Sequence, residues 1–128
     1  MTRFRADYVD EHGLSRHEVL EAKDRAAALE AFGRIDVLVN NSGGSSGGSF
    51  ADNTPADFEA GFDRNFWPAL RTSKAALAAL EASRGVIVHI GSIWGVEAGG
   101  LVAYNVAKAA LVSLTKAMGR EFAPKGMR

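Results

Sequence analysis

The sequence predicts an α/β layered fold, in which long helices pack against a sheet of parallel strands. Residues 35–39 and 86–90 are short and almost purely apolar, which is typical of strands buried on both faces of such a sheet. Segments whose apolar residues have helical spacing lie before, between and after these strands. The order helix, strand, helix, strand, helix contains no internal repeat and no linker, and it predicts a single domain over residues 1–128.

The composition is that of an ordinary globular protein. Of 128 residues, 47% are hydrophobic and 23% are charged, and 15 Lys and Arg balance 15 Asp and Glu. A net charge of zero without a dense basic run argues against nucleic acid as a partner. The absence of cysteine excludes disulfides and thiolate chemistry. No signal peptide is visible and no apolar run approaches the ~20 residues of a membrane span, so we expect a cytoplasmic protein with no membrane partner.

Residues 1–14 form a poorly defined N-terminal segment. Phe4, Ala6 and Tyr8 alternate with charged residues, which is typical of a short strand with one buried face. A frayed terminus would tolerate the same residues, so both interpretations stay open.

The first helix is expected over residues 16–32. Ser15, followed three residues later by Glu18, forms a capping box, in which each side chain can satisfy a free amide at the start of a helix. Gly33 is placed to end this helix in a left-handed conformation. The apolar stripe of the helix would consist of Val19, Ala22, Ala26 and Leu29.

A polar loop follows the strand predicted over residues 35–39. It runs from Asn40 to Ser49 and contains only Asn, Ser and Gly. Open α/β sheets bind ligands at the carboxyl ends of their strands, so we interpret this loop as part of a binding site. The alternative is a flexible Gly/Ser linker, which the position directly after a buried strand makes less favourable.

The second helix is expected over residues 55–82, because Thr54 can cap it and Pro55 suits its first position. Pro68 lies inside this helix and has no amide hydrogen, so the helix should bend near Asn65. The carbonyls that a bend leaves free can hold a water, and a water can conduct protons. The alternative is that Asn65 is an ordinary surface asparagine.

The second strand, residues 86–90, leads into a loop that begins with Gly91 and Ser92. A third helix is expected over residues 102–123 and would be ended by Pro124 and Gly126. Its apolar stripe would consist of Val106, Ala110, Leu114 and Met118.

Tyr104 and Lys108 are the strongest candidates for chemistry. They are four residues apart near the start of a helix, so they share a face. An ammonium beside a phenol favours the phenolate, and a tyrosine tuned in this way can exchange a proton with an alcohol or a carbonyl. The alternative is a tyrosine half-packed in the core beside a solvated lysine.

Ser92 supports the first interpretation, because it follows a buried strand and precedes Tyr104 by twelve residues. A hydroxyl at that place could donate to a substrate oxygen, although a serine there is more often a turn or cap residue. Trp94 fits either a substrate pocket or the core. The three histidines, His12, His17 and His89, have no spacing typical of a metal site, so we expect them to be structural or solvated.

Together these residues resemble one family, the short-chain dehydrogenases/reductases. The run Asn40-Asn41-Ser42-Gly43 is similar to the Asn-Asn-Ala-Gly segment of that family, with serine in place of alanine. Over roughly residues 16–128 the resemblance also aligns the family's catalytic tetrad with Asn65, Ser92, Tyr104 and Lys108. It implies a partial Rossmann-like, doubly wound parallel sheet that lacks the first and the last strands.

The resemblance implies an NAD(P)-dependent oxidoreductase that interconverts an alcohol and a carbonyl by hydride transfer. Tyr104 would be the general acid/base and Ser92 would polarise the substrate carbonyl. Lys108 would bind the nicotinamide ribose and lower the tyrosine pKa. The Asn65 backbone would hold a proton-relaying water. The residues implied for binding NAD or NADP are Asn40, Ser42, Gly43, Tyr104 and Lys108.

The resemblance also defines what the chain lacks and how it could assemble. The family's glycine-rich turn, which seats the cofactor pyrophosphate, has no counterpart in residues 1–40. The alternative function is therefore a non-catalytic remnant or a gene fragment of this family. The segment that distinguishes NAD from NADP is missing too. Family members commonly form dimers and tetramers through the helices corresponding to residues 55–82 and 102–123, so we expect a homo-oligomer.

Overall fold

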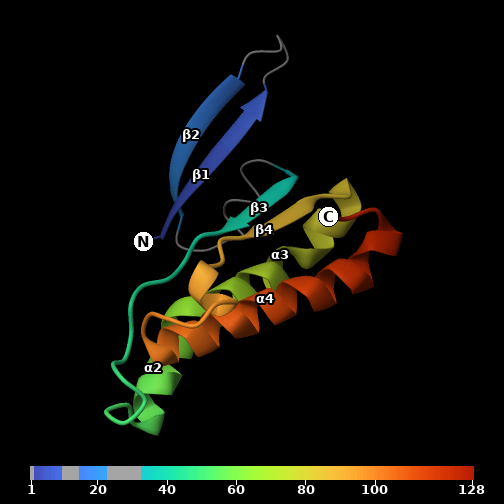
Figure 1. Cartoon of the computed structure of the whole chain (residues 1–128). Coiled ribbons are helices and arrows are strands. Elements are labelled where there is room, and N and C mark those ends of the chain that lie inside the picture. The colour runs from blue at the N-terminus through green and yellow to red at the C-terminus, as the bar shows by residue number, and fades with distance from the viewer. Residues whose placement is uncertain (1, 10–14, 23–32) are drawn as a thin grey trace. The chain divides into compact units, whose positions relative to one another are not determined.

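The computed structural model describes residues 2–9, 15–22 and 33–128. The chain divides into two compact units, residues 1–35 and 36–128, and each is described by itself. The elements of both units are labelled in Figure 1. The single domain over residues 1–128 stays a prediction.

The first unit contains an antiparallel pair of strands. β1 (Thr2–Val9) pairs with β2 (Ser15–Ala22) in a register that runs from Thr2 opposite Ala22 to Val9 opposite Ser15. Of the two interpretations of residues 1–14, the strand is therefore correct over β1.

The helix predicted over residues 16–32 is wrong where the structure describes it, because Ser15–Ala22 is a strand. The rest of the predicted helix, residues 23–32, lies outside the described residues. The capping box that predicted it is a local signal worth about 1 kcal/mol. Pairing with β1 along the whole strand satisfies the backbone groups on one edge of this segment instead. Gly33 does adopt the expected left-handed conformation, with φ of 71°.

The second unit contains the two predicted strands, and they are parallel. β3 (Val37–Asn40) pairs with β4 (Val86–His89), and the register ends with Asn40 opposite His89. On the other edge of β4, the Ile87 amide donates to the Arg128 carbonyl (2.8 Å) and the Arg128 amide donates to the Gly85 carbonyl (3.1 Å). Because β3 and β4 end level with each other, the loops that follow them start side by side.

The prediction that both strands are buried on both faces is wrong for this chain. Val37 and Val39 are 57% and 54% exposed, and Val88 and Ile90 are 39% and 43% exposed. These four side chains lie on one face of the sheet, and the helices of the unit all lie against the other face (Figure 1). An apolar run shows that both faces of a strand suit burial, but the layer that covers each face must be supplied by the rest of the fold.

The second predicted helix bends where Pro68 requires it to bend. α2 (Pro55–Asn65) and α3 (Trp67–Ser83) meet at Phe66, whose φ and ψ are −119° and −57°. At the start of α2, the Asp57 carboxylate accepts hydrogen bonds from the Thr54 amide and hydroxyl, each at 2.7 Å. These bonds hold the pKa of Asp57 below its ordinary value. The bend confirms the sequence prediction and places Asn65 at the last position of α2.

The third predicted helix is α4 (Val102–Phe122), which continues into the short helix η2 (Ala123–Lys125) and ends at Gly126. The apolar stripe predicted from the sequence is only partly buried, because Ala110, Leu114 and Met118 are half-buried. Val106 is 42% exposed, whereas the buried apolar positions nearest to it are Ala103, Ala107 and Leu111.

The reason is the close approach of α2 to α4. A Cβ on Gly61 would lie 3.0 Å from the Ala103 carbonyl oxygen, so the side of α4 that faces α2 admits only small residues. A prediction from hydrophobicity alone prefers positions with larger apolar side chains. It therefore selects the stripe that contains Val106 instead of the neighbouring stripe that contains Ala103 and Ala107. Alanine is accordingly the commonest buried apolar residue among those described, which are Ala69, Ala76, Leu80, Ala103, Ala107, Leu111, Phe122 and Met127.

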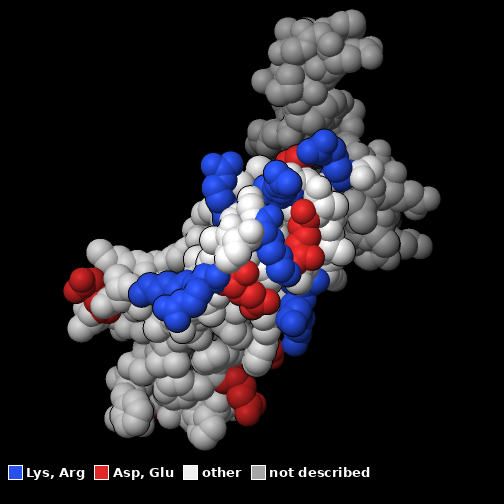
Figure 2. Space-filling model, turned by 90° about the vertical axis from the view of Figure 1, so that its right-hand side faces the viewer, with Lys and Arg blue, Asp and Glu red and all other residues white. Residues whose placement is uncertain are grey.

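Charged side chains of both signs are intermixed on the surface. Figure 2 shows Lys and Arg next to Asp and Glu on one face of the molecule, in keeping with the net charge of zero. Within residues 2–9, 15–22 and 33–128, no helix combines the length and the apolar character needed to cross a membrane.

Candidate active site

Two loops meet at the carboxyl end of the β3–β4 sheet. The Ile90 amide donates to the Asn40 carbonyl (2.9 Å), so the strand ends stay paired where the loops begin. The loop after β3 leads to α2. The loop after β4 contains the short helix η1 (Ile93–Gly95) and leads to α4. The predicted site residues therefore lie on four segments that meet at one edge of the sheet. These are the loop after β3, α2, the loop after β4 and α4.

Lys108 joins the two loops. Its side chain lies on α4 and is 4% exposed, and its Nζ donates to the Ile90 carbonyl (3.0 Å) and to the Ser42 carbonyl (3.3 Å). A buried ammonium requires such acceptors, because burial without them is strongly unfavourable. An ammonium has three N–H groups, so one remains for a further acceptor. The Tyr104 ring centroid lies 5.9 Å from the same Nζ.

Asn65 holds the loop after β3 from the other side. It is fully buried, its Oδ1 accepts from the Gly44 amide, and its Nδ2 donates to the carbonyls of Gly44 and Gly61, all at 3.0 Å. A Cβ on Gly43 would lie 2.8 Å from Asn65 Oδ1 and 3.1 Å from Lys108 Nζ. Two predicted catalytic residues and the loop thus meet at a position that only glycine can occupy.

Other side chains hold the Gly/Ser loop further along. Arg64 Nη1 donates to the Ser45 carbonyl (2.7 Å), and the Gly48 amide donates to Asn53 Oδ1 (2.7 Å). A flexible linker would leave its backbone to solvent. The loop instead follows a path set by hydrogen bonds to α2, α4 and its own asparagine, so the linker interpretation is wrong.

Ser92 caps the helix η1. Its Oγ accepts from the Trp94 amide (3.2 Å), and its backbone is extended, with φ of −157° and ψ of 150°. A hydroxyl that accepts one hydrogen bond still carries a hydrogen that it can donate. The cap role anticipated for a serine at this place is therefore present, and it is compatible with a second role as a donor.

Trp94 lies partly in solvent, at 41% exposure. Cβ atoms on Gly99 and Gly100 would lie 2.3 and 3.1 Å from atoms of its indole ring, so these glycines allow the following loop to close over the ring. The ring is therefore covered by the loop between η1 and α4 rather than by the helical core.

Gly95 sets the distance between η1 and α4. A Cβ at Gly95 would lie 2.9 Å from the Lys108 carbonyl carbon and 3.1 Å from the Ala109 amide nitrogen. We expect Gly95→Ala to lower the free energy of unfolding by about 1–3 kcal/mol, because backbone atoms cannot move aside as a side chain can. Urea denaturation followed by far-UV circular dichroism measures this change.

Gly91→Ala is the matched control for Gly95→Ala, since a Cβ at Gly91 would meet no atom within 4 Å. It should leave the free energy of unfolding within about 0.5 kcal/mol of the parent chain. Equal losses in the two variants would contradict the close contact at Gly95.

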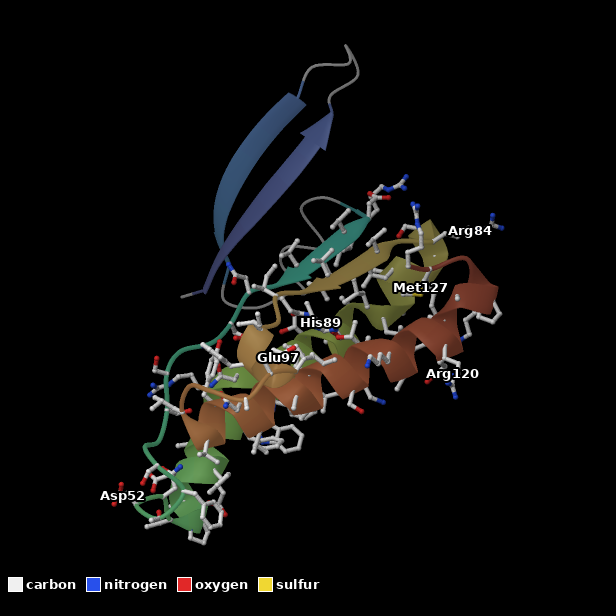
Figure 3. The ribbon with its side chains drawn as sticks, viewed as in Figure 1. Asp52, Arg84, His89, Glu97, Arg120 and Met127 are labelled. Atoms are coloured by element: carbon white, nitrogen blue, oxygen red, sulfur yellow. The ribbon has the colours of Figure 1, made fainter. Side chains whose placement is uncertain are left out.

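A polar cluster that we did not predict lies beneath the strand ends. Asn40 is 6% exposed, and its Nδ2 donates to Ser73 Oγ on α3 (3.0 Å) and faces His89 Nδ1 on β4 at 3.3 Å. Figure 3 shows His89 between the sheet and the helices. The prediction that His89 is structural or solvated did not include this pairing, although Asn40 and His89 are both at the carboxyl ends of predicted neighbouring strands.

Burial lowers the pKa of His89 below its ordinary value of 6.5. An unfolded chain therefore takes up the proton at a higher pH than the folded chain does, and the folded state loses stability as pH falls below about 6.5. We expect the urea midpoint of the wild type to fall between pH 7.5 and pH 5 by more than that of His89→Asn, in which this position cannot titrate. Identical pH dependence in the two proteins would contradict a buried neutral imidazole.

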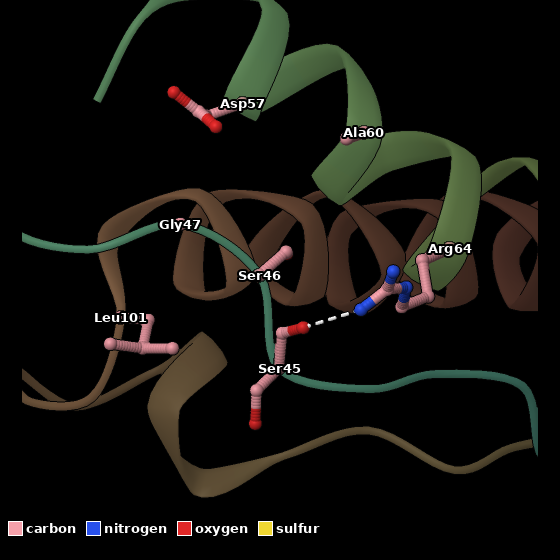
Figure 4. A pocket seen from close by; sticks show the side chains of 7 residues that line it. All are labelled: Ser45, Ser46, Gly47, Asp57, Ala60, Arg64 and Leu101. Carbon is pink, nitrogen blue, oxygen red and sulfur yellow. Dashed lines mark hydrogen bonds between the residues drawn. The ribbon is translucent and has the colours of Figure 1, made fainter.

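An open hollow of about 380 Å³ lies between the Gly/Ser loop, α2 and the start of α4. Figure 4 shows the hydrogen bond from Arg64 to Ser45 at its wall. None of the predicted catalytic residues lines it. Its lining consists of Ser45, Ser46, Gly47, Asp57, Ala60, Arg64 and Leu101.

The chain is similar in sequence to known proteins. The sequence model of the short chain dehydrogenase family matches residues 15–128. Among curated proteins, the 2,3-dihydroxy-2,3-dihydro-p-cumate dehydrogenase of Pseudomonas putida is 39% identical over 105 residues, which are 79% of this chain and 40% of that protein. The chain spans 40–46% of the length of three of its curated relatives.

The chain is also similar in fold to solved structures. The structure of ElxO with NADP bound has a TM-score of 0.75 and 34% identity, with 81% of this chain and 43% of that chain covered. A short-chain dehydrogenase/reductase family oxidoreductase of Brucella ovis, in complex with a partially ordered NAD, has a TM-score of 0.72 and 32% identity, with 80% and 50% covered.

Proposed function

Because this chain belongs to the short-chain dehydrogenase family, we propose that it carries the acid–base centre of an NAD(P)-dependent oxidoreductase that interconverts an alcohol and a carbonyl. The observation that supports this proposal best is the position of Lys108. Its buried ammonium joins the loops after both strands and lies beside the Tyr104 ring. A solvated lysine next to a half-packed tyrosine, which was the alternative, would have neither the burial nor the two carbonyl acceptors.

The described residues fit the nicotinamide-ribose end of the cofactor. Lys108 has one N–H beyond those that bind Ile90 and Ser42, and a ribose hydroxyl is a suitable acceptor for it. Gly43 has no side chain that would obstruct an approach to this ammonium. The side-chain nitrogen of Asn40 is directed to Ser73 and His89 inside the protein. Residues 40–43 would therefore contact a cofactor mainly through Ser42, Gly43 and the loop backbone. Relatives whose structures contain NADP and NAD support either nucleotide.

In the proposed reaction, Tyr104 donates a proton to the carbonyl oxygen of the substrate in reduction and takes one from the alcohol in oxidation. The Ser92 hydroxyl, whose oxygen is already held by the Trp94 amide, donates to the same substrate oxygen and polarises the carbonyl. The nicotinamide, when bound, supplies or accepts the hydride.

Lys108 and Asn65 support the tyrosine in this scheme. The ammonium of Lys108 lies 5.9 Å from the centroid of the Tyr104 ring, on the same face of α4. Asn65 keeps its side chain on Gly44 and Gly61, and its backbone at the helix bend would hold a water that relays protons towards Lys108. The side chain of Asn65 also fixes the loop that carries Ser42 and Gly43.

The test uses cofactor binding and turnover of the purified chain. We expect the fluorescence of NADH or NADPH to change on titration with the protein, and aldehydes or ketones to be reduced in its presence. A lack of binding at millimolar nucleotide would reject the proposal for this chain and favour the non-catalytic alternative. The homo-oligomer expected from the family stays a prediction, which sedimentation velocity measures.

A further inference from the structure

The cluster of Asn40, Ser73 and His89 has a defined hydrogen-bonding direction. An amide nitrogen is only a donor, so Asn40 Nδ2 gives one N–H to Ser73 Oγ and presents the other to His89 Nδ1. His89 Nδ1 therefore acts as an acceptor, and the hydrogen of the neutral imidazole is on Nε2, a buried atom with no hydrogen-bond partner among the described residues. Asn40 and His89 are also register partners at the last position of the two strands.

The residues that follow this pair carry the two carbonyls that hold Lys108. Ile90, whose carbonyl accepts from Nζ at 3.0 Å, comes directly after His89. Ser42, whose carbonyl accepts at 3.3 Å, comes two residues after Asn40. The Ile90 amide donates to the Asn40 carbonyl, which links the same two segments through the backbone. A shift of the side-chain pair would therefore move both acceptors of the ammonium.

We infer that His89 is a positioning residue for the Lys108 ammonium, acting through Asn40 on the two strand ends that carry its carbonyl acceptors. The inference takes its catalytic meaning from the proposed function, because Lys108 is there the partner of Tyr104. The inference also makes a claim that does not depend on any reaction, namely that the protonation of the His89 imidazole decides where the Lys108 Nζ is held.

Protonation of His89 is the natural perturbation of this arrangement. With a hydrogen on Nδ1, the ring would present an N–H to the N–H of Asn40 at 3.3 Å, and the amide would have to turn or withdraw. The group shown to face the imidazole is neutral: it is the Asn40 amide from β3, whose nitrogen also donates to Ser73 on α3. Among charged residues, Lys108 on α4 is bonded to the same strand end, through the carbonyl of Ile90, and Arg71 and Lys74 are exposed sequence neighbours of Ser73. Lys108 is a cation, so it does not favour an imidazolium.

The experiment follows the Lys108 ammonium by NMR in the whole chain labelled with 15N-lysine, between pH 5 and pH 8, without cofactor or substrate. Lys108→Arg assigns the Nζ signal, and the C–H signals of His89 give the titration of the imidazole. His89→Asn is the conservative variant, because its Oδ1 can take the place of Nδ1 as an acceptor and cannot be protonated in this range. His89→Leu removes the acceptor.

In the wild type we expect the Lys108 Nζ signal to shift as pH falls, with the same midpoint as His89. In His89→Asn the signal should stay constant with pH and close to its wild-type position at pH 8. In His89→Leu it should be displaced at every pH.

A Lys108 signal in the wild type that does not follow the His89 titration would overturn the inference, and so would the same pH dependence in His89→Asn. If His89→Leu does not fold, the comparison of the wild type with His89→Asn still decides. Failure here would leave the proposed role of Tyr104 untouched, because no turnover is measured. An inactive chain would likewise leave this result standing.

Discussion

Replacing Asn65 with alanine is expected to lower the free energy of unfolding by about 3 kcal/mol or more. The variant would leave the Gly44 amide and the carbonyls of Gly44 and Gly61 without the partners that the asparagine supplies. Each buried polar group that loses its partner costs about 1–3 kcal/mol, and water reaches the part of the loop that is only half-buried. Urea denaturation monitored by circular dichroism measures the loss.

Asn41→Ala is the matched control, because Asn41 lies in the same loop and is exposed. It should change the free energy of unfolding by less than about 0.5 kcal/mol. If Asn65→Ala lost less than about 1 kcal/mol, the asparagine would not be what holds the loop, and the backbone of residues 43–48 would have to be stabilised by other contacts.

Tyr104→Phe is expected to lower the rate of carbonyl reduction by a factor of about 10²–10⁴, the contribution typical of a positioned general acid. The change removes one oxygen from a half-buried side chain, so the helix α4 should keep its structure. Nucleotide binding should change little, since Lys108 keeps its two carbonyl acceptors. Initial rates with NADH or NADPH, together with the dissociation constant of the nucleotide, separate the two effects.

Tyr8→Phe is the control, because Tyr8 is the only other tyrosine in the sequence. It should retain the parent rate. A Tyr104→Phe protein that kept more than about a tenth of the parent rate would remove the tyrosine from the proposed mechanism, whatever its nucleotide affinity.

The parts of the fold that could be predicted from sequence are those set by signals within a few residues. Pro68 lacks an amide hydrogen, and the helix bends at Phe66 as that absence requires. The apolar runs before Asn40 and before Ser92 form the parallel strands, and the loops that follow them meet at one edge of the sheet. Four residues are one turn of a helix, so Tyr104 and Lys108 share a face.

The errors concern contacts between residues distant in the sequence. The capping box of Ser15 and Glu18 is a local helix signal, and pairing of that segment with β1 prevails over it. The buried stripe of α4 depends on how closely α2 approaches Ala103, which no property of α4 reveals. His89 was interpreted without its partner, because a strand pattern does not show which residue lies opposite in the neighbouring strand.

The hydrogen bonds of Lys108 also determine when this centre can exist during folding. Its acceptors at Ser42 and Ile90 are 66 and 18 residues away along the chain, so both strands must be paired and α4 docked before the ammonium can reach them. Contacts of such long sequence separation form slowly, because the chain must first close large loops. The proposed acid–base centre therefore cannot form in a chain whose strands are unpaired or whose α4 is undocked.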